Sequence, residues 1–240
     1  MRLLATVVCV EEAMMLSGAV DLLDVKNPSK GSLGAPDIKT VRDIKKAVGS
    51  ATPLSVALGD LDGKTVGLGL SMASAGADII KIGLADIRRA KAIDVFKTLK
   101  KNLPPKVRVV AAAYADAGYH RFFSPSGLPS FAVEAEADGI LIDTFEKSGK
   151  KLFDFLSVYE LASIISTARG LKLMTALAGS LGADDIEDAA LAAPGFVGFR
   201  SAITISGNRS GHGVDPCKVS LLKDRLIKAG ENRKTLSLSE

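Results

Sequence analysis

Several residue types and patterns are scarce in this chain of 240 residues, and each scarcity argues against a class of protein. Tryptophan is absent, aromatic residues make up 5%, and no block of lysine and arginine stands out, which disfavours a nucleic-acid-binding surface. No apolar run reaches the roughly 18 residues that a membrane span requires. Cys9 and Cys217 are too few for a disulfide framework. We therefore expect a cytoplasmic protein that binds neither nucleic acid nor a membrane.

Metal and nucleotide signatures are also missing. His120 and His212 are the only histidines, and neither has ligand spacing with cysteine or carboxylate residues. The first expected strand runs into Cys-Val-Glu-Glu at 9–12, without the glycine fingerprint of a dinucleotide-binding turn. The mild net charge of +4 suits phosphorylated or carboxylated small molecules as well as a solvated surface. We predict no metal and no cofactor.

Eight short β-rich segments recur along the chain, nearly all as continuous apolar runs. Such runs are typical of strands buried on both faces, as in a parallel sheet. The segments are 3–8, 22–26, 54–58, 79–82, 107–113, 139–143, 172–177 and 196–199. Helical spacing of apolar residues lies between them, most clearly at 37–48, 86–103, 157–169 and 215–229.

The number of units decides the architecture. Eight β-then-α units of about 30 residues each are typical of a (β/α)8 barrel. An open, doubly wound sheet is the alternative, but it would normally carry the glycine fingerprint after the first strand. We predict a single-domain (β/α)8 TIM barrel over residues 1–230, followed by a polar, frayed tail at 231–240.

Charged residues stand at the ends of three alternate strands. Lys81 follows two isoleucines and precedes a third, so an outward orientation would bury its ammonium beneath a helix. Lys26 and Asp24 share one strand face because side chains alternate with period two, and Asp143 ends the sixth strand. Alternate strands fill the same barrel layer, so Lys26, Lys81 and Asp143 are expected to converge. The competing interpretation is a self-neutralising internal salt bridge.

Two neighbouring lysines have a chemical meaning. A lysine amine is nucleophilic only when neutral, and both burial and a second cation lower its pKa. That arrangement favours a Schiff base with a carbonyl substrate, with the second lysine and the aspartates moving protons.

The last two units contain candidate phosphate ligands. In these barrels the loops after strands seven and eight often bind phosphate, and a helix N-terminus attracts anions. The candidates are Gly179, Ser180, Arg200, Ser201, Gly207 and Arg209. A second loop, 30–34, follows Lys26 and is either an ordinary turn or another phosphate site, with Asn27 and Lys30 as its candidates.

Several motifs together resemble a known family. Asp-Val-Lys-Asn-Pro at 24–28 with Lys-Gly-Ser-Leu-Gly-Ala at 30–35 resembles the opening motif of the (5-formylfuran-3-yl)methyl phosphate synthases, also called 4-(hydroxymethyl)-2-furancarboxaldehyde-phosphate synthases. Further similar motifs follow in order along most of the chain. They are 81–84, 112–117, 143–144, 152–155 and 176–180.

The resemblance implies a barrel that condenses two molecules of glyceraldehyde 3-phosphate to the furan precursor of methanofuran. It implies that Lys26 forms the Schiff base and that Lys81 transfers protons, while Asp24, Asp143 and Lys147 support the site. The only partner we expect besides triose phosphate is a further copy of the chain. A Schiff-base aldolase acting on a phosphorylated sugar and a non-catalytic phosphosugar-binding protein remain the alternatives.

Overall fold

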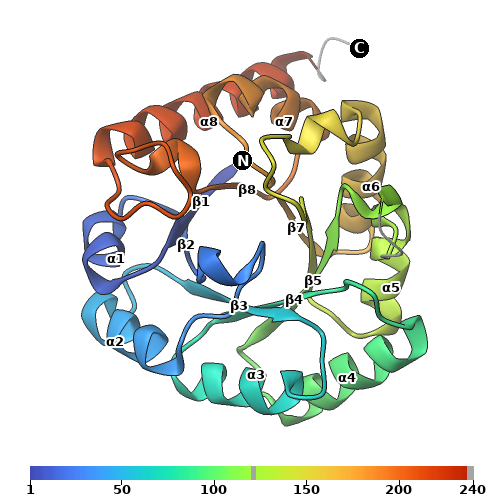
Figure 1. Ribbon diagram of the computed structural model, residues 1–240. Coiled ribbons are helices and arrows are strands. Elements are labelled where there is room, and N and C mark those ends of the chain that lie inside the picture. The colour runs from blue at the N-terminus through green and yellow to red at the C-terminus, as the bar shows by residue number, and fades with distance from the viewer. Residues whose placement is uncertain (120–122, 237–240) are drawn as a thin grey trace.

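The computed structural model describes residues 1–119 and 123–236, and within them eight parallel strands close into a barrel in sequential order. The strands are β1 (Arg2–Val7), β2 (Leu22–Val25), β3 (Leu54–Asp60), β4 (Ile79–Gly83), β5 (Arg108–Tyr114), β6 (Gly139–Asp143), β7 (Met174–Leu177) and β8 (Phe196–Phe199). A ring of helices surrounds the strands (Figure 1). The prediction of a (β/α)8 TIM barrel is therefore confirmed.

The helices of the ring alternate with the strands. They are α1 (Val10–Leu16), α2 (Ile38–Val48), α3 (Thr65–Ser74), α4 (Arg89–Asn102), α5 (Leu128–Glu134), α6 (Val158–Gly170), α7 (Ile186–Ala192) and α8 (Pro216–Leu236). Short 3-10 segments precede several of them, at η1 (Pro28–Lys30), η2 (Ala117–Tyr119), η3 (Pro125–Gly127), η4 (Leu152–Asp154), η5 (Ala183–Asp185) and η6 (Ser201–Ile203). None of the helices in the described part of the chain is both long and apolar enough to cross a membrane.

The predicted segments agree with the observed elements except at the C-terminus. Each predicted strand overlaps an observed one, with ends that differ by at most two residues. The expected tail at 231–240 is wrong in its first part, because α8 continues to Leu236. This segment has no apolar stripe, but it consists of residues compatible with a solvated helix, and 231–233 are exposed. Residues 237–240 lie outside the described part.

Alternation along the strands divides the core into two layers. Leu23 and Val25 of β2 belong to the large cluster between the sheet and the helices, whereas Leu22 belongs to a smaller cluster inside the barrel. Period two therefore carries Asp24 and then Lys26 along the inner line towards the mouth. On β4, Ile79 likewise faces the interior, which places Lys81 on the same side.

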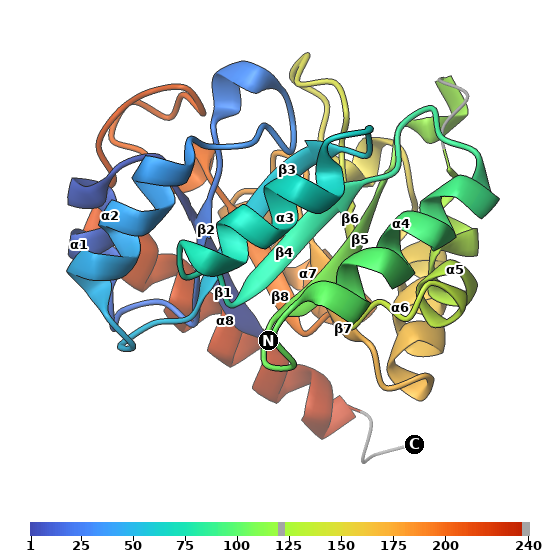
Figure 2. The same ribbon diagram turned by 90° about the horizontal axis from the view of Figure 1, so that it is seen from below.

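The loops that follow the strands gather at one end of the barrel, and the N-terminus lies near the opposite end (Figure 2). The segment that contains η1 extends over the barrel mouth (Figure 1). It is closed at its base, where the Asn27 amide donates to the Gly34 carbonyl at 2.8 Å. Leu33 is 2% exposed and packs into the interior cluster. The mouth is thus partly covered by the chain that directly follows Lys26.

Candidate active site

A cavity at the C-terminal mouth of the barrel brings the predicted charged residues together. We call it the inner cavity. Its polar and glycine lining comprises Thr6, Asp24, Lys26, Lys81, Asp143, Lys147, Gly179, Ser180, Gly198, Arg200, Ser201 and Arg209. The side chains come from opposite sides of the barrel, so the expected convergence of strands two, four and six is present.

Asp24 pairs with Lys81 deep in this cavity. The Lys81 Nζ lies 2.6 Å from Asp24 Oδ1, and the two side chains are 5% and 1% exposed. The Ser55 hydroxyl donates to the same oxygen at 2.7 Å, while the Thr6 hydroxyl donates to Oδ2 at 3.3 Å. The buried carboxylate therefore has a counter-ion and two further donors, which offset its loss of hydration.

Asp143 pairs with Lys147 in a second ion pair of the cavity. The Lys147 Nζ donates to Asp143 Oδ1 and to Thr144 Oγ1, each at 2.7 Å. Burial acts to raise the pKa of Asp143, but the ammonium groups of Lys147 and Lys26 and the Lys147 and Thr144 hydrogen bonds hold it well below its usual range. Asp143 is therefore a fixed negative charge.

Lys26 is left without such a partner. It is 8% exposed, and no ion pair or hydrogen bond within the described residues involves its Nζ. Burial lowers the pKa of Lys26 to about 8, and the cations of Lys81 and Lys147 act in the same direction against the opposing pull of Asp143 and Asp24. At pH 7 about one Lys26 in ten is then neutral, far more than for a free lysine.

The loop after β7 provides an anion cradle, defined here as the backbone amides of residues 179–181. These three consecutive amides have no hydrogen-bond partner in the described chain. Gly179 has φ +118° and Ser180 has φ +57°, so the backbone turns through the left-handed region. Successive free amides in such a turn form a concave anion-binding site. Gly179, Ser180 and Leu181 all line the inner cavity.

Arg200 also lines the inner cavity, but it is held by the protein and not free to bind phosphate. Its guanidinium forms a two-point salt bridge with Glu12, with Nη1 to Oε2 at 2.6 Å and Nη2 to Oε1 at 3.1 Å. Its other N–H groups donate to the carbonyls of Thr6, Arg209 and Gly211. All five donors of the fork are used, so the geometry gives Arg200 a positioning role.

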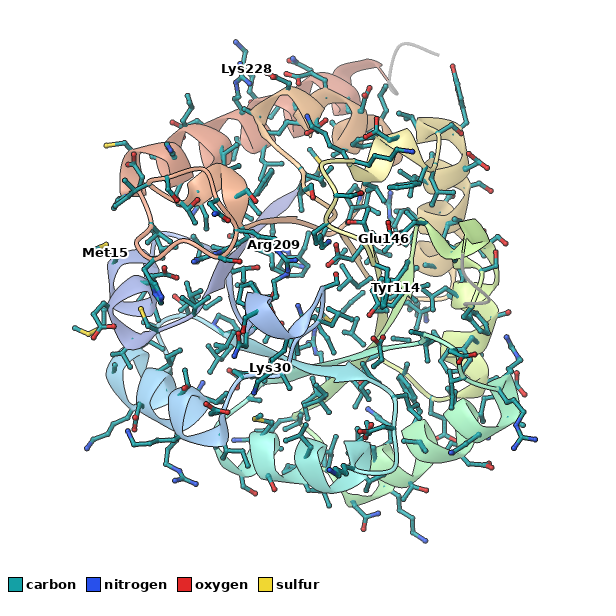
Figure 3. All side chains as sticks on the ribbon, in the orientation of Figure 1. Met15, Lys30, Tyr114, Glu146, Arg209 and Lys228 are labelled. Carbon is teal, nitrogen blue, oxygen red and sulfur yellow. The ribbon has the colours of Figure 1, made fainter. Side chains whose placement is uncertain are left out.

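Arg209 is the arginine that the geometry leaves available. It lies over the barrel mouth near the loop that carries Lys30 (Figure 3), and its Nη2 donates to the Gly31 carbonyl at 3.1 Å. Burial lowers the pKa of Arg209, Asp143 opposes this, and Arg200 adds to it. The group remains a cation near neutral pH because its ordinary pKa is so high.

The structure places only some of the other predicted phosphate ligands in the inner cavity. Ser201 lines the inner cavity, whereas Gly207 does not. Asn27 is used within its own loop, since its Oδ1 accepts from the amide and hydroxyl of Ser29. The Lys30 ammonium points to Asp37, 3.4 Å away, and also lies outside the cavity.

Several supporting residues were missed from sequence. Thr6 and Ser55 carry no local motif, and Glu12 is a buried carboxylate, 2% exposed, in an otherwise ordinary first helix. The Tyr114 hydroxyl, at the end of β5, donates to Asp60 Oδ1, at the end of β3, at 2.6 Å. Burial is the main cause that raises the pKa of both groups. For Thr6, Asp60 and Tyr114 a position at the carboxyl end of a strand was the available signal, whereas Ser55 and Glu12 had none.

The donor set does not suggest a metal. Within 1–119 and 123–236 no group of three or more histidine, cysteine, aspartate or glutamate side chains is arranged to hold an ion. His212 lies at the edge of a separate groove with Thr40 and Ser210. His120 lies outside the described residues, so its predicted lack of a metal role stays a prediction.

Fold and cavity together define a (β/α)8-barrel protein with buried lysines at the mouth where enzymes of this fold place their active sites. Comparison with known proteins specifies the family: residues 3–223 match the family model described as 4-HFC-P synthase, and the chain belongs to that family. Its relatives are named as synthases, so the chain is an enzyme. The resemblance drawn from the motifs is confirmed.

Two relatives and one solved structure illustrate the similarity. The (5-formylfuran-3-yl)methyl phosphate synthase of Methanosarcina acetivorans is 37% identical over 85% of this chain and 90% of its own length. That of Methanosarcina mazei is 37% identical over 88% and 93%. The crystal structure of KGPDC from Streptococcus mutans has a TM-score of 0.67 at 12% identity, covering 95% of this chain and 98% of its own. The last comparison shows the fold alone.

Replacing the unpaired lysine should stabilise the protein. We expect Lys26→Met to raise the free energy of unfolding at pH 7 by about 1–3 kcal/mol, because the fall of the pKa from 10.5 to about 8 measures the cost of the buried ammonium. The folded pKa lies below the unfolded one, so the wild type regains this stability as the pH rises from about 8 to 10.5. The gain of the variant should therefore shrink across that window.

Urea unfolding at pH 7 and pH 10 measures this difference. Lys97→Met, at an exposed position on α4, is the matched control and should change stability by less than about 0.5 kcal/mol. A Lys26→Met protein no more stable than the wild type at pH 7 would contradict the assignment of a costly buried charge.

Proposed function

We propose that this enzyme condenses two molecules of glyceraldehyde 3-phosphate to (5-formylfuran-3-yl)methyl phosphate through a Schiff base on Lys26. One observation carries the proposal: a buried lysine with a pKa of about 8 and no ion-pair partner within the described chain lines the same cavity as a set of unpaired backbone amides. A nucleophilic amine beside an anion cradle suits a substrate with a carbonyl at one end and a phosphate at the other.

The proposed reaction balances without a redox partner. Two triose phosphates, less one inorganic phosphate and two waters, have the composition of the phosphorylated furan aldehyde. Each step is an addition or an elimination, and none needs a net electron donor or acceptor. The donor set of the cavity, made of amines, carboxylates and hydroxyls, is sufficient for proton transfers of that kind.

Imine formation begins with the neutral fraction of Lys26. Its amine adds to the substrate carbonyl, and loss of water from the carbinolamine leaves the imine. The oxygen must be protonated before it departs as water. Each of the ammonium groups of Lys81 and Lys147 is held by one aspartate, so a proton given up can be returned at a fixed position.

The imine then makes the neighbouring carbon-bound proton acidic. Removal of that proton gives an enamine, and the enamine carbon attacks the aldehyde carbon of the second triose phosphate. We assign the proton transfers at carbon to Lys81, because its pair with Asp24 is buried and supported by Ser55. Lys81 accepts the carbon-bound proton as the neutral amine that remains after it has protonated the departing oxygen. Asp143 stays ionised and stabilises cationic intermediates on Lys26.

Borohydride trapping tests the proposed nucleophile and reaction. Reduction during turnover with glyceraldehyde 3-phosphate should attach the substrate carbons to Lys26, as located by peptide mass mapping. The same mixture without borohydride should gain the ultraviolet absorbance of a conjugated furan aldehyde. Lys26→Ala should give neither signal, and Lys97→Met should give both.

The alternatives predict other outcomes in the same assay. A label on Lys81 would exchange the two lysine roles, whereas a label on Lys26 without furan absorbance would indicate an aldolase. Absence of any label, with full furan formation by Lys26→Ala, would rule out the imine mechanism. A protein that binds triose phosphate without forming an adduct or product would be a non-catalytic binder.

Replacing the two arginines at the mouth should have different effects, one on substrate binding and the other on stability. Arg209→Gln should raise the KM for triose phosphate about 10- to 100-fold, the usual effect of losing a charge-assisted hydrogen bond to phosphate. Arg200→Gln should instead lower the free energy of unfolding by about 3–5 kcal/mol, because Glu12 would remain buried without its partner. Steady-state kinetics and urea unfolding of both variants check this. An unchanged KM in Arg209→Gln would place the phosphate elsewhere.

A further inference from the structure

Lys26 lines a second hollow besides the inner cavity. We call this hollow the outer groove; its walls are η1, the first turn of α2, and the loop between β8 and α8. Lys26 is the only residue shared by the two linings among those described. Lys26 therefore lies between the two spaces, and its buried ammonium has no partner within the described chain.

The outer groove carries donors that the protein does not use. Thr40, Ser210 and His212 line it, and no side chain of the three makes a hydrogen bond or ion pair within 1–119 and 123–236. Asp37 precedes α2 without a side-chain cap, which leaves the first-turn amides available to an anion. The Asp37 carboxylate is itself on the wall, where the Lys30 ammonium lies 3.4 Å away and reduces its repulsion of an anion.

One contact couples the walls of the two spaces. Arg209 lines the inner cavity and donates to the Gly31 carbonyl at 3.1 Å, while the next residue, Ser210, lines the outer groove. The loop after β8 and the segment after β2 therefore meet beside Lys26. A phosphate held by the anion cradle in the inner cavity leaves the outer groove as the second approach to the same amine.

Condensation of two substrates on one lysine requires such an arrangement. The first triose phosphate, bound as the imine, occupies the inner cavity with its phosphate on the cradle. The second must place its aldehyde carbon against the enamine carbon; the new carbon–carbon bond forms there, and the aldehyde oxygen takes up a proton. The outer groove is the other space that Lys26 lines, which makes it the candidate route for the acceptor aldehyde.

We propose that the outer groove is the subsite of the second triose phosphate, with its phosphate at the N-terminus of α2 and in contact with Thr40, Ser210 and His212. This inference rests on the proposed function and assigns a site to its second substrate. It predicts that the imine on Lys26 forms independently of the outer groove, whereas the furan does not.

A blocked groove tests the proposal. Thr40→Trp fills the outer groove, and Lys39→Trp places the same side chain on the exposed neighbour, 84% exposed at the side chain. With glyceraldehyde 3-phosphate, Thr40→Trp should give wild-type borohydride labelling of Lys26 but lose more than about tenfold in furan formation. Lys39→Trp should retain both. His212→Ala, at an exposed position, should raise the KM for furan formation about tenfold with labelling intact.

The other outcomes overturn the inference in distinguishable ways. Normal furan formation by Thr40→Trp would show that the outer groove is not used. Loss of labelling as well as furan in a folded Thr40→Trp would make it the entrance for the first substrate. Where thermal unfolding shows that Thr40→Trp is not folded, unchanged kinetics in His212→Ala decide against the subsite. Failure of the wild type to give label or furan would instead refute the proposed function.

Discussion

Three lysines share the inner cavity with two aspartates, and this unequal number governs the chemistry of the site. Lys81 is paired with Asp24 and Lys147 with Asp143 at 2.6 and 2.7 Å, which leaves Lys26 as the lysine without a partner in the described chain. Loss of one proton from Lys26 makes the five groups neutral as a set. Burial and the two neighbouring ammonium groups favour that state, and this is why the pKa falls to about 8. A third carboxylate would restore an inert, fully charged lysine.

The barrel and the Glu12–Arg200 salt bridge hold the charged groups of the site in position. Period two along β2 and β4 directs Asp24, Lys26 and Lys81 inward, so no helix covers them. On the other side of the mouth, the Glu12–Arg200 pair joins the first helix to the end of β8. Glu12 also accepts from the amides of Val8 and Gly213, which fixes the loop that carries Arg209. A buried salt bridge is used here for geometry more than for stability.

Local patterns made the barrel and much of the site predictable. Continuous apolar runs gave the strands, and alternation along them gave the convergence of Lys26, Lys81 and Asp143. Which lysine pairs with which aspartate could not be predicted from the sequence. Asp24 stands two residues before Lys26, and this spacing favours an Asp24–Lys26 pair. The register of β2, β3 and β4 instead brings the Asp24 carboxylate to Lys81.

Two further differences between prediction and structure have different causes. Arg200 has the sequence context of a phosphate ligand, and its true acceptor, Glu12, is 188 residues away along the chain. The polar end of α8 lacks an apolar stripe, yet backbone hydrogen bonding extends the helix to Leu236. The Arg200 partner has no local signal, because it depends on which segments the closed barrel brings together, whereas the end of α8 depends on hydrogen bonds within its own helix.

The pH dependence of Lys26 reactivity tests the central claim most directly. Brief labelling with an amine-arylating reagent, quantified by peptide mass spectrometry at a series of pH values, reports the neutral fraction of each lysine. Exposed Lys97 provides the internal reference. The structure predicts a midpoint near 8 for Lys26, well below the value of about 10.4 that is usual for a free lysine. Equal midpoints for the two lysines would contradict the account.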